Sequence, residues 1–110
     1  ALFHYTLRKK TNTLFLSQIM ILESRSRKMV ITTADGETQE YYGTIKEAAQ
    51  KTASPAFAQL HNSYIVNLEY IAAVDSGEVV LRDGTRLPGS QKFHISFHSA
   101  WRNFILMRGR

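Results

Sequence analysis

Short segments in which apolar and polar residues alternate run through most of the chain. The alternation has the two-residue period of a strand with one buried face, and it is clearest over residues 3–8. Asp-Gly pairs at positions 35–36 and 83–84 each separate two such segments, and this pair is a strong signal for a β-hairpin turn. Polar residues 9–12 and 23–28 are expected to form a turn and a basic loop. The pattern therefore predicts a mostly β protein, with strand-like segments at residues 3–8, 29–33, 38–42, 57–60, 64–68, 71–74, 78–82 and 86–88, and one or two further strands within residues 14–22.

Two segments depart from the strand pattern and predict helices. Thr44 and Glu47 have the spacing of a capping box, and residues 48–51 favour a helix. This short internal helix is expected to end before Pro55, because the residue preceding a proline is disfavoured in the helical region. After Ser90, apolar residues recur at spacings of three and four, which predicts a C-terminal helix with one apolar face. The residues of that face are Phe93, Phe97, Trp101, Phe104 and Ile105.

Composition bounds the class of protein. The 110 residues contain no internal repeat or linker, so residues 1–110 are expected to form a single domain. The chain has no cysteine, which excludes a disulfide framework and fits a reducing cytoplasm. No apolar run reaches the roughly 18 residues of a membrane span. The chain starts at Ala1 without a methionine, and we expect it to be part of a longer protein.

Charge points to a polyanionic partner, and the motifs of common enzymes are missing. The formal net charge is +5, and a small basic domain is suited to neutralising phosphates. The sequence has no Gly-rich phosphate loop and neither a GxSxG nor an HExxH motif. His94 and His98 would share a helix face, but two ligands are too few for a usual zinc site. We therefore expect no catalytic residue, no metal and no cofactor.

The most specific pattern lies in the stretch FAQLHNSYIVNLEYI, at residues 57–71. Its order of apolar and polar positions resembles the central motif of the LytTR family, which are DNA-binding domains of bacterial response regulators. Other pieces agree in order: IMILES at residues 19–24, the helix at residues 43–50, and VLRDG at residues 80–84 followed by LPGS at residues 87–90. The residues that carry the central motif are Phe57, His61, Ser63, Val66, Asn67, Leu68 and Ile71.

This resemblance implies a fold and a mode of DNA binding. It implies a mostly β domain built as an elongated stack of small antiparallel sheets, with one short internal helix and a C-terminal helix. It also implies binding of double-stranded DNA through loops that enter successive major grooves, in place of a recognition helix. By analogy the domain would act as a dimer on paired DNA repeats, after an N-terminal receiver domain.

Three segments carry over as candidate DNA contacts. Many family members have arginine at the positions of Asn62 and Gln91, so this chain departs from the usual pattern there. Amide side chains pair with adenine, whereas arginine pairs with guanine. The expected base contacts are Asn62, Arg25, Arg27 and Gln91, and the expected phosphate contacts are Lys28, Ser63, Ser90, Lys92 and His61.

Several of these polar residues have a second interpretation. Asn67 stands between two apolar residues and is expected to be a buried hydrogen-bond partner. His61 fits a structural role as well as a DNA contact, and the run of residues 25–28 also fits a solvated loop. An RNA-binding or single-strand-binding domain, or a protein-interaction module, is the alternative to the duplex-binding interpretation.

Overall fold

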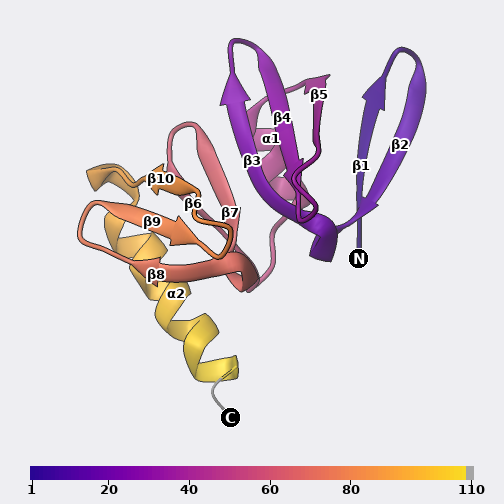
Figure 1. Cartoon of the computed structure of the whole chain (residues 1–110). Coiled ribbons are helices and arrows are strands. Elements are labelled where there is room, and N and C mark those ends of the chain that lie inside the picture. Colours follow the sequence, from indigo (N-terminus) through magenta and orange to yellow (C-terminus); the bar gives the residue numbers. More distant parts are fainter. Residues whose placement is uncertain (109–110) are drawn as a thin grey trace.

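Three antiparallel sheets lie side by side in the computed structural model, which describes residues 1–108 (Figure 1). The molecule is elongated, with extents of 41 × 29 × 24 Å. This arrangement confirms the expected elongated stack of small sheets. The outer two-stranded sheet is β1 (Leu2–Leu7) and β2 (Lys10–Phe15). The central sheet has the order β5 (Thr38–Tyr42), β4 (Lys28–Thr33), β3 (Ile19–Arg25), β7 (Tyr64–Asn67) and β6 (Phe57–His61), and the third sheet has the order β10 (Arg86–Pro88), β9 (Glu78–Leu81) and β8 (Ile71–Val74).

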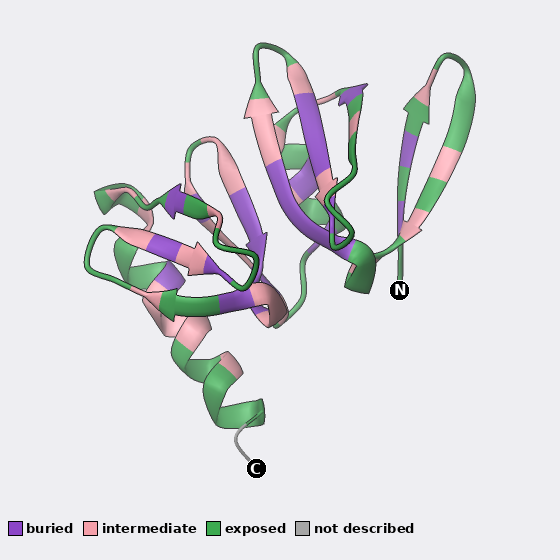
Figure 2. Cartoon of the chain, viewed as in Figure 1, coloured by how far each residue is buried: buried purple, intermediate pink, exposed green. Residues whose placement is uncertain are grey.

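Both faces of the central sheet are covered. Figure 2 shows buried residues running along β3 and β7, the middle of this sheet. One face packs against β1 and α1 in a first core that includes Phe3, Leu22 and Ile65. The other face packs against the third sheet and α2 in a second core. Burial on both faces explains why residues 19–22 form a continuous apolar run in the sequence instead of an alternating one.

The internal helix α1 (Ile45–Lys51) begins as predicted. The Glu47 amide donates to the Thr44 hydroxyl and the Thr44 amide donates to the Glu47 carboxylate, both at 3.2 Å, which completes the capping box. The helix ends at Lys51, earlier than the proline alone requires. Thr52 caps this end, because both its amide and its hydroxyl donate to the carbonyl of Ala48.

The C-terminal helix α2 (His94–Arg108) follows a short 3-10 turn at Gln91–Phe93. Phe97 is buried, and Trp101 and Phe104 pack against the second core, as the apolar face predicts. The same pattern predicts Ile105 on that face, but this residue is 45% exposed. The prediction is wrong there because the end of α2 runs beyond the sheets (Figure 1). Within the described residues, neither helix has the length and apolarity that a membrane crossing requires.

Two connections are shorter than the sequence predicts. The polar composition of residues 9–12 predicts a turn, but the turn is Arg8 and Lys9, and β2 already begins at Lys10. Residues 23–28 are expected to form a loop, but β3 continues to Arg25 and β4 begins at Lys28. Cross-strand pairing overrides the polar composition here, because β2 and the last three residues of β3 are only partly buried or exposed and therefore accept charged side chains.

Candidate nucleic-acid interface

The first candidate segment is the tip of the β3–β4 hairpin. Ser26 and Arg27 form the turn with positive φ angles of 47° and 59°. The guanidinium of Arg25 donates two hydrogen bonds to the Glu23 carboxylate, at 2.9 and 3.3 Å, and this partner raises the pKa of Arg25. Lys28 lies 3.6 Å from the Glu40 carboxylate. Arg25 and Lys28 are therefore already oriented by acidic neighbours, whereas Arg27 is exposed at the end of the tip.

The second segment is the tip of the β6–β7 hairpin, and His61 organises it. Its Nδ1 accepts a hydrogen bond from the Ser63 amide at 3.0 Å, which closes the turn. The His61 ring also packs beside Tyr64, with ring centroids 5.5 Å apart. Asn62, between them, is exposed. The imidazole thus serves the local backbone, and Asn62 is the side chain presented to solvent.

The third segment begins where the third sheet ends. The Ser90 amide donates to the Leu60 carbonyl at 2.9 Å, one residue before His61. The Ser90 hydroxyl is buried and has no hydrogen-bond partner among the described residues. Gln91 and Lys92 follow in the 3-10 turn and are both exposed. The groups that this segment exposes to solvent are therefore the side-chain amide of Gln91 and the ammonium group of Lys92.

Backbone contacts hold the three segments together. The Ser24 amide donates to the Ser63 carbonyl at 2.9 Å, which continues the β3–β7 ladder to the two hairpin tips. The contact between Ser90 and Leu60 adds the third segment on the other side of β6. Figure 1 shows the tips of the β3–β4 and β6–β7 hairpins pointing in the same direction. The fold thus gathers all of the expected contact segments along one edge.

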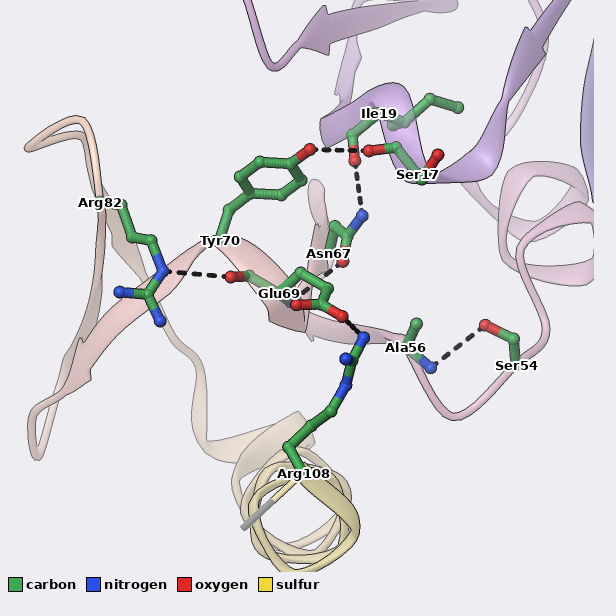
Figure 3. A network of polar contacts seen from close by, with 9 residues as sticks. All are labelled: Ser17, Ile19, Ser54, Ala56, Asn67, Glu69, Tyr70, Arg82 and Arg108. Carbon is green, nitrogen blue, oxygen red and sulfur yellow. Dashed lines mark hydrogen bonds and ion pairs between the residues drawn. The ribbon is translucent and has the colours of Figure 1, made fainter. Parts of the chain in front are cut away.

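Asn67 lies at the opposite end of β7 and is 1% exposed. Its Nδ2 donates to the Ile19 carbonyl at 2.9 Å, and its Oδ1 accepts from the Glu69 amide at 3.0 Å. Figure 3 shows this amide at the junction of two sheets, beside the Tyr70 hydroxyl, which donates to Ser17. The prediction that Asn67 is a buried hydrogen-bond partner is confirmed.

Comparison with known protein families shows to which family the chain belongs. A model of the LytTr DNA-binding domain matches residues 9–102. The chain belongs to the LytTr DNA-binding domain family. The resemblance that the sequence motif indicates is confirmed, and DNA is the partner of this LytTr domain.

Similar proteins agree with this assignment. Accessory gene regulator protein A of Staphylococcus epidermidis is 31% identical over 78 residues, which cover 68% of this chain and 32% of the relative. This LytTr domain thus spans about a third of that relative's length. A solved structure, the LytTr DNA-binding domain of a putative methyl-accepting/DNA response regulator from Bacillus cereus, superposes with a TM-score of 0.75 at 21% identity. The match covers 90% of this chain and 94% of that one, so the two share the fold.

The histidine pair of this LytTr domain lies next to the third segment. The rings of His94 and His98 have centroids 4.3 Å apart on α2. They line a hollow of about 250 Å³ together with Ser90 and Gln91. Burial, followed by the charges of His94 and Arg102, lowers the pKa of His98. No cluster of three or more potential metal-ligating side chains occurs within residues 1–108.

Sequence reasoning does not identify Glu23 as a partner of Arg25. The two residues are two apart in a strand, so their side chains share one face, and that spacing is the available signal. The ion pair between Glu23 and Arg25 is not predicted because the polar composition of residues 23–28 indicates a loop, and side-chain directions are not fixed in a loop.

Proposed function

We propose that this domain reads a specific sequence of double-stranded DNA through the edge formed by the three segments. The observation that carries the proposal is the pair of backbone contacts, Ser24 to Ser63 and Ser90 to Leu60, that holds these segments together. Hairpin tips that project from a rigid sheet can enter a groove without a recognition helix, as β-ribbons do in the major groove. We propose further that the domain acts in the cytoplasm as the effector part of a bacterial transcription regulator.

Base reading is assigned to four exposed side chains. Asn62 at the β6–β7 tip has the donors and acceptor to pair with adenine N6 and N7, and Gln91 has the same chemistry. Arg27 has a planar fork that fits guanine O6 and N7. Arg25 could bind the same guanine atoms, but its guanidinium would first have to give up its ion pair with the Glu23 carboxylate. Asn62 and Arg27 are therefore the leading pair.

Phosphate contacts are assigned to the groups around these tips. Lys92 is exposed beside Gln91, and Lys28 is partly exposed at the base of the β3–β4 tip. Ser63 and the ring Nε2 of His61 flank Asn62, where a backbone phosphate would follow a base in the groove. The family resemblance also implies a phosphate contact for Ser90, but its hydroxyl is buried, so we expect its amide contact to Leu60 to position Gln91 and Lys92 instead.

The assembly is a further part of the proposal. The chain covers 32% of the length of its curated relative, and the similar solved domain comes from a response regulator. We propose that residues 1–110 are one domain that follows a phosphoacceptor receiver domain. Dimers on paired DNA repeats would double the number of contacts and the specificity. No cofactor or metal enters this proposal.

Selection of bound duplexes from a random pool tests the function directly. We expect a consensus with two or three short blocks of fixed bases, because separate tips read separate groups of base pairs. The selected duplex should outcompete its own separated strands and an RNA of the same sequence. Enrichment without a consensus would contradict base reading, and preference for single strands would favour the alternative class of binder.

A further inference from the structure

The β1–β2 hairpin carries a second basic tip that none of the three segments includes. Arg8, Lys9 and Lys10 are consecutive, and all three are exposed. No acidic residue precedes Glu23 in the chain, so this hairpin has no carboxylate of its own. None of the ion pairs found within residues 1–108 involves these three side chains. The tip is therefore a concentrated positive charge without an internal partner in the described structure.

The backbone of this tip repeats that of the β3–β4 tip. Arg8 and Lys9 have φ angles of 54° and 65°, and the other non-glycine residues with positive φ in residues 1–108 are Ser26 and Arg27. Two-residue turns of this kind favour asparagine and glycine, because a larger side chain strains the backbone. Three of the four residues are basic despite that strain. Strain of this kind clusters at binding sites, where the side chain is needed at that position.

One hollow connects the β1–β2 tip with the base of the β3–β4 tip. Arg8 and Lys28 line the same open hollow of about 250 Å³, together with Glu40 and Tyr42. Figure 1 shows the β1–β2 and β3–β4 hairpins with their tips on the same side of the molecule. The β1–β2 tip thus extends the edge of the three segments at one end of the stack of sheets.

We propose that the β1–β2 tip clamps the phosphate backbone of the same duplex, beside the bases that the three segments read. The proposal rests on the proposed function, because it needs the duplex to lie along that edge. The long dimension of 41 Å matches about 12 base pairs at ~3.4 Å each. Arg8 and Lys9 supply charge and hydrogen-bond donors to phosphate oxygens, and they carry no sequence information at this position.

The double variant Arg8→Asn, Lys9→Asn tests the clamp without disturbing the turn, because asparagine tolerates positive φ. Binding of the selected duplex is measured between low and moderate salt. We expect the plot of log affinity against log salt to flatten by about 1.8, which is ~0.9 for each lost phosphate contact. The preference between selected and random duplex should stay unchanged. The control variant Lys46→Gln, Arg102→Gln removes two exposed charges from α1 and α2 and should leave the slope unchanged.

A second binding experiment varies the length of the duplex. On a duplex trimmed to the selected core, the Asn double variant and the parent should bind alike, because the flanking phosphates are gone. An unaltered slope on the long duplex would overturn the clamp while leaving the proposed function in place, provided that the parent still selects a consensus. A parent protein that binds no duplex in a salt-dependent manner would instead overturn the proposed function itself.

Discussion

At the scale of the residue, two asparagines five positions apart have opposite surroundings. Asn67 is 1% exposed and its amide joins β3 to the 3-10 turn after β7, whereas Asn62 is exposed at a hairpin tip. The difference comes from the strand that joins them, because Asn62 lies just beyond one end of β7 and Asn67 is its last residue. Replacing each asparagine with alanine should therefore have different effects: the change at Asn62 should weaken DNA binding, and the change at Asn67 should lower stability.

Asn62→Ala should weaken binding to the selected duplex by about 1–3 kcal/mol and relax the preference at one or two base pairs. The cause is the loss of a bidentate contact to an adenine edge. Titration of the selected duplex and of duplexes with single base changes measures both effects. Equal weakening on selected and random DNA would show that Asn62 does not read a base.

Asn67→Ala should lower the free energy of unfolding by about 1–3 kcal/mol, because it leaves the Ile19 carbonyl and the Glu69 amide without their partner. Urea denaturation measures the loss. Asn62→Ala is the matched control and should change stability by less than about 0.5 kcal/mol, as exposed substitutions usually do. A stability loss of the same size in both variants would contradict the buried role of Asn67.

At the scale of the element, four hairpin turns place residues at positive φ, and they form two groups. The Asp-Gly turns have glycines with φ of 88° at Gly36 and 93° at Gly84, so the residue type matches the backbone. The two basic tips use the positive φ region without glycine. Sequence signals therefore place the first group at the correct residues. They misplace the second group, as a turn at residues 9–12 and a loop at residues 23–28, since no turn rule favours Arg-Lys or Ser-Arg at these positions.

The cap of α1 gives an element-scale prediction. Thr44→Ala should cost about 1 kcal/mol of stability, because the Glu47 amide and carboxylate both lose the Thr44 hydroxyl as their partner at the helix start. Thermal or urea unfolding measures it. Thr44→Ser keeps the hydroxyl and should stay close to the parent. If the serine variant were destabilised as much as the alanine variant, packing of the threonine methyl group would be the cause instead.

At the scale of the whole molecule, charge and shape act together. The net charge of +5 is distributed on an elongated body whose hairpin tips lie along one edge. Counterions released from DNA make affinity depend on salt in proportion to the number of phosphates contacted. The affinity of this edge for DNA should therefore fall as salt rises, and each lysine or arginine that contacts a phosphate should add its own part to that slope.

Lys92→Ala should flatten the plot of log affinity against log salt by about 0.9, the contribution of one phosphate contact. Lys28→Ala should flatten it by less, because Glu40 at 3.6 Å already neutralises part of its charge. Both changes should weaken selected and random duplexes together. A slope equal to that of the parent in the Lys92 variant would remove this residue from the phosphate contacts.

Local signals in the amino-acid sequence are enough to predict the class of elements and the family. Alternation, the Asp-Gly pairs and the capping box each depend on residues within a few positions of one another. They locate the strands, the start of α1 and most of α2. The motif at residues 57–71 indicates the family, and its pattern of apolar neighbours already distinguishes Asn67 from Asn62.

The meeting of distant segments depends on the tertiary structure instead. Ser24 lies beside Ser63 at the end of the β3–β7 pairing, and Leu60 lies beside Ser90 through a backbone hydrogen bond, although these parts of the chain carry no mutual signal in one sequence. The same pairing shortens the expected basic loop to two residues and gives Arg25 its carboxylate partner. Packing of the β1–β2 sheet against the central sheet also brings Arg8 to the hollow that Lys28 lines. Long-range pairing fixes these neighbours because register and packing depend on the complete sheet, whereas local patterns depend only on the residues within them.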